Sequence, residues 1–442
     1  MKRITILFWL LCLGLIALWV AAEPGVLRLP PFAQLKIPLI NVTGIVAMGA
    51  MSVSMLLALR SVAVEPHVGG LDKSYRLHKW LGVAGLVMAI AHWLLISAPG
   101  WFVALGVGGA PARGSGPRTL EKGPALLHTL EGPARGVGQW GFYGVLVLLV
   151  LALLRWFPYR YFIKTHRLLA IVFMVLVFHS VVLLKLAYWT HTVAYVITAL
   201  MAAGTAAALY ILVRRVGRTR QAVGEVETVT THQDGRISGV TIRLKDRWAP
   251  HEAGQFAFVT FDHTEGPHPF TIASPWKGDG RLQFLIKGLG DYTTGLHKSV
   301  EKGSLVTIEG PYGQFTFAGR RQRQIWISAG IGISPFLSRM QQLVAWPDDK
   351  KVDLFHATAV RDDQPIAQLR ELASAANVRL HVWISAEEGR LTAAQIRNDR
   401  PDWHDADIWF CGPVEFGRDL RKDLVAHGLD PQDFHQELFH LR

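Results

Sequence analysis

HKWLGVAGLVMAIAHWLLISA (residues 78–98) and THRLLAIVFMVLVFHSVVLLKL (residues 165–186) are two long apolar segments, and each contains two histidines. The four side chains are His78, His92, His166 and His179. The first segment has them at the spacing i, i+14 and the second at i, i+13. An ionisable side chain inside hydrocarbon is costly, so its presence in such a segment indicates a functional site. Two spaced pairs predict bis-imidazole ligation of two stacked haems, and hence electron transfer across a membrane.

Six apolar segments of this length occur in the first half of the chain. They cover residues 4–22, 38–59, 78–98, 137–157, 165–186 and 193–213. Each has about the 20 residues that an α-helix needs to cross ~30 Å of hydrocarbon. The first segment also resembles a signal peptide, because Lys2 and Arg3 precede it and small residues end it. The apolar run is long for a signal peptide, so we expect a retained helix.

Basic residues gather in alternate loops between these segments. Arg60, Lys73 and Arg76 follow the second segment, and further groups at 155–167 and 214–220 follow the fourth and the sixth. Cytoplasmic loops carry an excess of Lys and Arg, so this pattern predicts a cytoplasmic N-terminus and a cytoplasmic C-terminal half in a bacterial-type plasma membrane. The loop at 99–136 would face outward, although it carries Arg113, Arg118 and Arg135.

With this topology, the third and fifth segments run in the same direction. Fourteen helical residues rise ~21 Å and thirteen rise ~20 Å, so His78 is level with His166 and His92 is level with His179. One haem therefore fits between the two histidines of each level pair. Thirteen steps of a helix miss the starting face by about 140°, so the fifth segment needs a distortion, a tilt or different histidine rotamers. The alternative is four core histidines bonded to neighbouring helices, but two level pairs favour the haems.

Composition limits the other possibilities. The net charge is +12, but many of its Lys and Arg residues lie beside the apolar segments, where membrane topology explains them, and no nucleic-acid partner is expected. The two cysteines, Cys12 and Cys411, are far apart in the sequence. They support neither a disulfide framework nor a thiolate metal site.

The chain after residue 216 has the pattern of a soluble protein. Short runs of strand-like residues lie at 221–231, 236–244, 255–261, 281–287 and 305–309. Turn residues separate them, which predicts a small antiparallel β-barrel over residues 217–318. Residues 319–442 instead alternate strand-like runs with helical segments, which predicts a parallel sheet with crossover helices.

A glycine loop, AGIGISPF, follows the first strand-like run of the second part. Gly330 and Gly332 would let the backbone approach a pyrophosphate, Ser334 would cap the following helix, and Pro335 suits its first turn. The positive end of that helix would then face the phosphates. A plain strand–turn–helix is an equal alternative for the loop alone, but its position after a barrel favours nucleotide binding.

The complete pattern resembles the ferric reductase and NADPH oxidase superfamily of flavocytochromes b. The histidine spacings of 14 and 13, the residues HPFTI at 268–272, the glycine loop at 330–335 and CGP at 411–413 all match motifs of that family. The resemblance covers essentially the whole chain. It implies a transmembrane di-haem domain at 1–216, an FAD-binding barrel at 217–318 and an NAD(P)-binding α/β domain at 319–442, the last two similar to ferredoxin–NADP reductase.

The same resemblance implies roles for individual residues. His268, Pro269, Phe270, Thr271, Ile272 and Ser274 would line the flavin, with the Thr271 hydroxyl near the atom that accepts hydride. Lys287, Gly290, Thr293 and Thr294 would hold the FAD diphosphate, although Lys287 is also plausible as a solvated strand end. Cys411 would lie by the nicotinamide, or serve only as a small buried side chain. Phe439 is our choice for the aromatic ring that covers the flavin, although three more residues follow it.

The coenzyme and the acceptor are left open by the sequence. Arg361 and Arg390 follow two successive strand-like runs and favour the 2′-phosphate of NADPH, whereas Asp362 and Asp363 would suit the ribose of NADH. Dioxygen is the expected small extracytoplasmic acceptor. A ferric chelate is one alternative, and a protein or a quinone is another, because related membrane cytochromes supply periplasmic enzymes. The resemblance to animal oxidases is not complete, since the further histidine in their third segment is replaced by Ile96. There is no calcium-binding loop motif, and no protein activator is expected.

Overall fold

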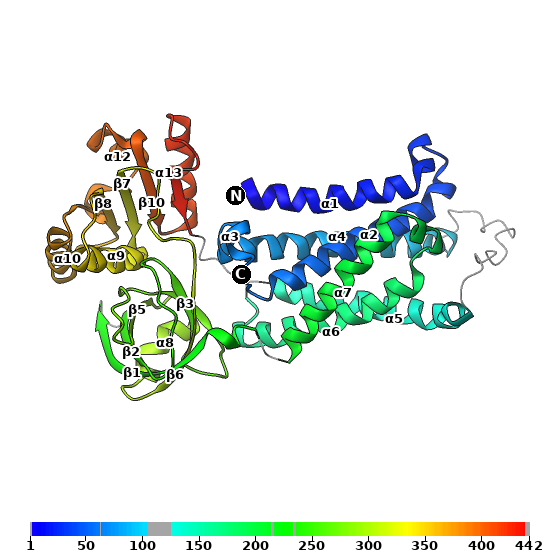
Figure 1. Ribbon diagram of the computed structural model, residues 1–442, viewed down its shortest axis with the longest axis horizontal. Helices are drawn as coiled ribbons and strands as arrows, with labels where there is room; N and C mark the ends of the chain where they lie inside the picture. Colours follow the sequence, from blue (N-terminus) through cyan, green and yellow to red (C-terminus); the bar gives the residue numbers. More distant parts are fainter. Residues whose placement is uncertain are drawn as a thin grey trace. The chain divides into compact units, whose positions relative to one another are not determined.

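The computed structural model describes residues 2–61, 63–104, 125–154, 156–213, 216–232 and 236–437. The chain divides into two units, one formed mainly by residues 1–216 and the other by residues 217–440 (Figure 1). Among the described residues of the first unit, six helices are long and apolar enough to cross a membrane, as predicted. These helices are α1 (Lys2–Ala22), α2 (Phe32–Leu57), α4 (Leu71–Ala104), α5 (Ala125–Leu153), α6 (Tyr159–Leu183) and α7 (Thr192–Leu212).

The helices begin earlier than the sequence predicted. The predicted second segment began at Pro38, but that proline lies inside α2, and Pro133 likewise lies inside α5. Proline is tolerated within membrane helices because neighbouring helices and side chains satisfy the freed backbone groups. Short helical turns complete the connections: η1 (Pro24–Arg28), α3 (Glu65–Val68) and η2 (Leu186–Thr190).

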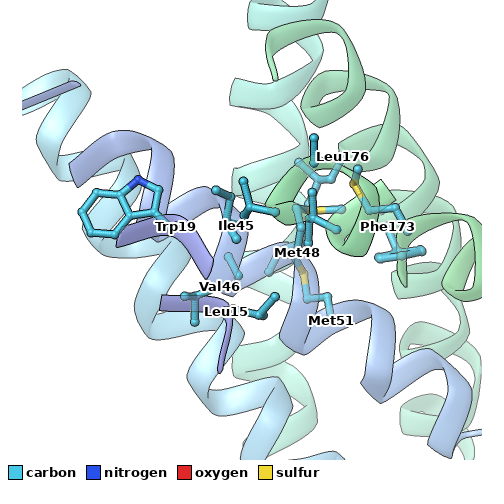
Figure 2. Close-up of a cluster of buried hydrophobic side chains, with 14 of the residues drawn as sticks. Leu15, Trp19, Ile45, Val46, Met48, Met51, Phe173 and Leu176 are labelled. Atoms are coloured by element: carbon cyan, nitrogen blue, oxygen red, sulfur yellow. The ribbon is translucent and has the colours of Figure 1, made fainter. Parts of the chain in front are cut away.

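The core of the bundle contains buried residues from all six long helices. Figure 2 shows part of it, where Leu15 of α1 lies near Val46 and Met48 of α2, and Phe173 and Leu176 of α6 lie on the other side of Met48. Glycines allow the helices to approach closely: a Cβ at Gly204 of α7 would lie 2.8 Å from the Phe173 ring. Small residues at such contacts are how helices associate in lipid, where apolar burial alone gives little driving force.

The second unit begins with the predicted antiparallel barrel. Its six strands are hydrogen-bonded in the order β4-β3-β6-β1-β2-β5. They are β1 (Gln221–His232), β2 (Ile237–Leu244), β3 (Phe256–Thr260), β4 (His268–Thr271), β5 (Arg281–Lys287) and β6 (Leu305–Tyr312). A single bridge between Ile272 and Phe284 links the two edges of this sheet, so the barrel is nearly closed. Helix α8 (Asp291–Ser299) lies between β5 and β6 in the chain.

A five-stranded parallel sheet follows, also as predicted, in the order β11-β10-β7-β8-β9. The strands are β7 (Arg323–Ala329), β8 (Lys351–Thr358), β9 (Val378–Ile384), β10 (Ala406–Cys411) and β11 (Phe434–Gln436). The helices are α9 (Ser334–Ala345), α10 (Asp363–Ala375), α11 (Ser385–Glu388), α12 (Ala393–Asp399) and α13 (Val414–Ala426). Because the strands are parallel, the residues that follow β7 and β10 meet at one edge of the sheet, where α/β proteins bind ligands.

Candidate functional site

The structure brings the four membrane histidines together in the predicted pairs. The ring centres of His78 and His166 are 5.8 Å apart, and those of His92 and His179 are 6.3 Å apart. One member of each pair comes from α4 and the other from α6. Two imidazoles on opposite sides of one metal ion should have centres roughly 6 Å apart, with metal–nitrogen bonds of ~2 Å and ring centres about 1 Å behind each nitrogen. The observed separations fit that arrangement.

Backbone carbonyls hold three of these rings. The Nδ1 atoms of His78, His92 and His179 lie 2.9, 2.9 and 2.8 Å from the carbonyl oxygens of three residues on neighbouring helices. The acceptors are Ser54, Ile40 and Ala134 respectively. A carbonyl can only accept, so each Nδ1 must carry the proton and each Nε2 keeps its lone pair. This is the form of histidine that binds metals, with the outer hydrogen bond fixing the ring.

Helix α2 serves both histidines of α4. Its acceptors, Ile40 and Ser54, have the same spacing along the sequence as His78 and His92 on the helix opposite. The two helices therefore keep one register over the whole distance between the pairs. The sequence did not identify α2 as the supporting element. Every residue has a backbone carbonyl, so no particular residue type marks the acceptors.

A glycine lies one helical turn beyond each acceptor of the second pair. Gly44 follows Ile40 by four residues, and a Cβ there would lie 3.4 Å from the His92 ring. Gly138 follows Ala134 by four residues, and a Cβ there would overlap the His179 ring. The missing side chain at Gly138 is what allows the His179 ring to reach its carbonyl, whereas Gly44 only lets the His92 ring lie close against α2. These glycines were the available sequence signal, and it was missed.

His166 is supported differently. Its ring stacks on Phe162, with centres 5.0 Å apart and planes at 28°. Helix α6 is continuous from Tyr159 to Leu183, so the spacing of thirteen is accommodated without a break in the helix. The difference in phase is therefore taken up by the tilt of the helix or by the rotamers of the two histidines. In the described ranges, no three His, Cys, Asp or Glu side chains gather as a metal site.

The second candidate site surrounds the HPFTI segment, whose first four residues form β4. The strand pairs with β3 in antiparallel register, from Phe256 opposite Thr271 to Val259 opposite His268. The ring of His268 stacks on Tyr292, with centres 4.7 Å apart and planes at 19°. Burial lowers the pKa of His268 to about 4, so its ring is neutral at neutral pH. Tyr292 lies in the first turn of α8 and was not singled out from the sequence.

Ser274 and Ile272 help to shape the same segment. The Ser274 hydroxyl accepts a hydrogen bond of 3.1 Å from the backbone N–H of Gln283. The backbone carbonyl oxygen of Ser274 lies 2.8 Å from Nε2 of His251. The Ile272 side chain is fully buried, and its backbone N–H donates to Gln255. These two residues therefore fix the end of β4, and Ser274 keeps one hydroxyl proton to donate.

Helix α8 begins beside this strand. The Thr293 hydroxyl accepts from the backbone N–H groups of Leu289 and Gly290 at 3.0 and 3.2 Å. A Cβ at Gly288 would lie 3.1 Å from the backbone of Thr294, so the turn from Lys287 into the helix is tight. The first N–H groups of a helix have no acceptor within the helix, and a phosphate is the acceptor that helix N-termini favour.

The glycine loop lies at the carboxyl edge of the parallel sheet, as predicted. Gly330 has a φ of +55°, and a Cβ at Gly332 would overlap the Cys411 carbonyl. Pro335 lies in the first turn of α9, but Ser334 is not the helix cap. The Ser334 hydroxyl instead donates to the Ile331 carbonyl at 2.9 Å. The predicted cap was wrong because the 3₁₀ turn η4 (Gly330–Ile333) precedes α9 and already places Ser334 within helical backbone.

The two candidate arginines differ in their surroundings. Arg361 forms a two-pronged ion pair with Glu387, at 3.0 and 2.7 Å, and lies 3.9 Å from Asp363. Within the described part of the chain, Arg390 is exposed and forms no ion pair. Arg390 is therefore the more available of the two for an anionic group.

Cys411 ends β10, the strand between β11 and β7, and is buried. Burial, together with the negative charge of Glu437, raises the pKa of its thiol. Glu437 follows β11, and a Cβ at Gly313 would lie 2.7 Å from its Oε1. Sequence reasoning did not select Glu437. The predicted flavin-covering residue, Phe439, lies outside the described residues.

Three sequence families match consecutive parts of the chain. Residues 43–177 match the ferric reductase like transmembrane component, residues 226–316 match an FAD-binding domain, and residues 326–422 match an oxidoreductase NAD-binding domain.

Curated relatives share parts of the sequence. A flavohemoprotein of Xylella fastidiosa is 28% identical over 204 residues, which are 43% of this chain and 51% of that protein. The beta subunit of a heme-dependent oxidative N-demethylase of Ectopseudomonas mendocina is 29% identical over 144 residues, which are 33% of this chain and 44% of that protein. The chain thus spans about half the length of these relatives. Among solved structures, a flavohemoglobin from Malassezia yamatoensis covers 92% of this chain and 98% of its own, at 18% identity and a TM-score of 0.49.

Proposed function

We propose a function from one premise: the chain belongs to the ferric reductase and NADPH oxidase type of flavocytochromes, whose transmembrane, FAD-binding and NAD-binding domains it combines. It is a multi-pass membrane protein with a C-terminal dehydrogenase half, and an NAD(P)H-dependent oxidoreductase. The proposal concerns its haems, the side on which each half-reaction occurs, and the acceptor.

The proposed reaction moves electrons from cytoplasmic NADPH through FAD and two b-type haems to an extracytoplasmic acceptor. When bound, the flavin would take up hydride and release single electrons, and the haems would pass those electrons across the bilayer. The observation that carries the proposal is the two histidine pairs, with ring centres 5.8 and 6.3 Å apart. His78 and His166 would hold the haem near the cytoplasm, and His92 and His179 the haem near the outer face.

The chain's own residues have distinct tasks in this scheme. Neutral His268, stacked on Tyr292, and Thr271 would line the flavin, while Lys287 and the start of α8 would meet its diphosphate. Gly330, Gly332, Ser334 and Pro335 would receive the phosphates of the nicotinamide coenzyme at the edge of the parallel sheet. Arg390 supports NADPH over NADH, because it is the candidate without a carboxylate partner in the described residues.

Dioxygen is the proposed acceptor, with two superoxide ions, NADP⁺ and a proton formed from each NADPH and two O₂. Each haem would be held by two histidines, so the acceptor would take electrons without binding the metal. The same constraint allows a ferric chelate, a protein or a quinone. Ile96 is 52% exposed, so the position of the extra histidine in animal oxidases does not face the centre of this bundle.

The deciding experiment uses the full-length protein purified with haem and FAD. NADPH consumption is measured in air, with superoxide detected as dismutase-sensitive cytochrome c reduction, and then without oxygen in the presence of a ferric chelate. We expect superoxide in air. Turnover with the chelate alone would show that the protein is a ferric reductase. If the purified protein had no haem absorption spectrum, the proposal of electron transfer through haems would be wrong.

His92→Ala provides the test of the relay, and His191→Ala is its control because His191 is exposed and outside both pairs. We expect His92→Ala to lose one haem and nearly all acceptor reduction, while NADPH still reduces the remaining haem. Unchanged acceptor reduction in His92→Ala would contradict the relay.

A further inference from the structure

Both histidines of α4 have a hydroxyl beside Nδ1 in addition to the carbonyl. The Ser54 Oγ atom lies 2.9 Å from Nδ1 of His78, and the Thr43 Oγ1 atom lies 3.3 Å from Nδ1 of His92. Both hydroxyls come from α2, and both residues are buried, with 5% and 9% exposure. Each Nδ1–H therefore faces two oxygens from the same helix.

The direction of these hydrogen bonds follows from the other partners of the hydroxyls. Ser54 can donate its single proton to the His78 carbonyl at 3.3 Å, and Thr43 can donate to the Leu39 carbonyl at 2.8 Å. Since Nδ1–H is itself a donor, the hydroxyl oxygens face it as acceptors. Each imidazole proton is thus shared between a carbonyl and a hydroxyl oxygen.

Ser52 shows that a buried serine on α2 need not contact a histidine of α4. It is fully buried two positions before Ser54, and its hydroxyl donates to the Met48 carbonyl at 2.7 Å, within its own helix. Satisfying a hydroxyl in this helix therefore requires no contact with α4. Ser54 and Thr43 differ from Ser52 in that each touches a candidate haem ligand.

Acceptors on Nδ1–H make the other ring nitrogen a stronger electron donor to a metal. A stronger donor stabilises ferric over ferrous iron and lowers the reduction potential, and hydrogen bonding around the ligands is a recognised means of tuning haem potentials. For His179 the corresponding contact is with the Ala134 carbonyl at 2.8 Å. The hydroxyls are side chains, unlike the carbonyls, so their effect on the potential of each haem can differ with the residue that lies beside the α4 histidine.

We propose that Ser54 and Thr43 are positioning residues that set the two haem potentials separately. Ser54 lowers the potential of the haem held by His78 and His166, and Thr43 lowers that of the haem held by His92 and His179. The inference rests on the proposed function, since it requires haem at both pairs. It predicts that each potential can be changed without the other, because each hydroxyl contacts a different histidine.

The test is a potentiometric titration of the purified holoprotein, followed by the visible absorption of the haems. The variants are Ser54→Ala and Thr43→Val, with Ser52→Ala as the matched control. We expect each of the first two to shift one wave of the titration upward, by up to about tenfold in the ferric–ferrous equilibrium, or ~59 mV for one electron. Ser52→Ala should leave both waves unchanged.

Two further variants separate the effect of the hydroxyl on the haem potential from the effect of a changed side-chain volume. Ser54→Thr and Thr43→Ser keep the hydroxyl and should keep the wild-type potentials. A shift of the same wave by both hydroxyl-removing variants, or of neither wave while both haems are present, would overturn the inference. Failure of wild-type protein to bind haem at all would instead overturn the proposed function on which it rests.

Discussion

Gly138 of α5 lies directly against the ring of His179 of α6, so close that a single added Cβ would overlap the imidazole. The same ring donates from Nδ1 to the carbonyl of Ala134, one turn earlier in α5. The glycine therefore decides whether this histidine can reach its acceptor and present its other nitrogen to a metal.

We expect Gly138→Ala to lose the haem held by His92 and His179 and to keep the other one. The added methyl group must displace the ring, because the helix backbone of α5 cannot retreat without disturbing its packing on α6. The measurement is the haem content per chain, together with the visible spectrum of the reduced protein.

Gly136→Ala is the control, because a Cβ at that position of the same helix meets nothing within 4 Å. It should retain the full haem content. Full haem content in Gly138→Ala, with an unaltered spectrum, would show that the position of the His179 ring does not depend on this glycine.

The sequence predicted the histidine pairing because helical rise and residue spacing alone determine which residues are level. It could not predict what holds the rings. Ile40 and Ala134 act through backbone carbonyls, which every residue carries, and only Gly44 and Gly138 leave a trace in the residue types. A glycine four residues after an acceptor is a weak signal until the neighbouring helix is known.

In the soluble half, too, the sequence predicted the secondary structure but not the contacts between distant segments. Alternation and turn residues predicted the barrel and the parallel sheet, because these patterns are local. The stacking of His268 on Tyr292 joins β4 to α8, and the contact between Gly332 and Cys411 joins the loop after β7 to the end of β10. Serine is a common helix cap, but the turn that precedes α9 places Ser334 inside the helix instead of at its cap.

Gly332→Ala should abolish reduction of the protein by NADPH. A Cβ at this position would overlap the Cys411 carbonyl, so the loop that is proposed to receive the coenzyme phosphates must move away from the sheet edge. The measurement is stopped-flow reduction of the flavin by NADPH. Dithionite, which needs no coenzyme site, should still reduce the haems to the wild-type extent; NADPH reduction at the normal rate would disprove the role of the loop.

Arg390→Gln should raise the KM for NADPH roughly tenfold, the equivalent of about 1.4 kcal/mol, and leave the KM for NADH nearly unchanged. The reason is that an unpaired arginine can bind a 2′-phosphate without first giving up a carboxylate. Arg361→Gln is the comparison, because that guanidinium is already paired with Glu387. A selective loss of NADPH use in Arg361→Gln alone would assign the phosphate to Arg361.

Both free cysteines should resist alkylation in the folded protein. Cys12 and Cys411 are buried, and burial and Glu437 raise the pKa of the Cys411 thiol, so almost none of it is thiolate under mildly alkaline conditions. The thiolate is the reactive form. Peptide mass spectrometry after brief treatment with N-ethylmaleimide should find Cys411 unmodified, and then fully modified after denaturation. Rapid labelling of the native protein would mean that the β10 edge opens in solution.

His356 should make the soluble half less stable as the pH falls from about 6.5 to about 4. Its Nδ1 lies 2.8 Å from the Ser328 hydroxyl, and burial lowers its pKa to about 4. In that window the unfolded chain binds a proton at this residue and the folded chain does not, so acid favours unfolding. The pKa difference corresponds to roughly 3 kcal/mol at most, and no further loss from this group is expected below about pH 4.

The measurement is the pH dependence of the thermal unfolding midpoint of the full-length protein, followed by tryptophan fluorescence. His356→Gln should have a lower midpoint at neutral pH, from lost packing, but a shallower fall as the pH is lowered through that window. His404→Gln is the control, because that histidine is exposed on η5 (Trp403–Asp405), and it should keep the wild-type slope. Equal slopes in wild-type and His356→Gln protein would show that this histidine is protonated without unfolding.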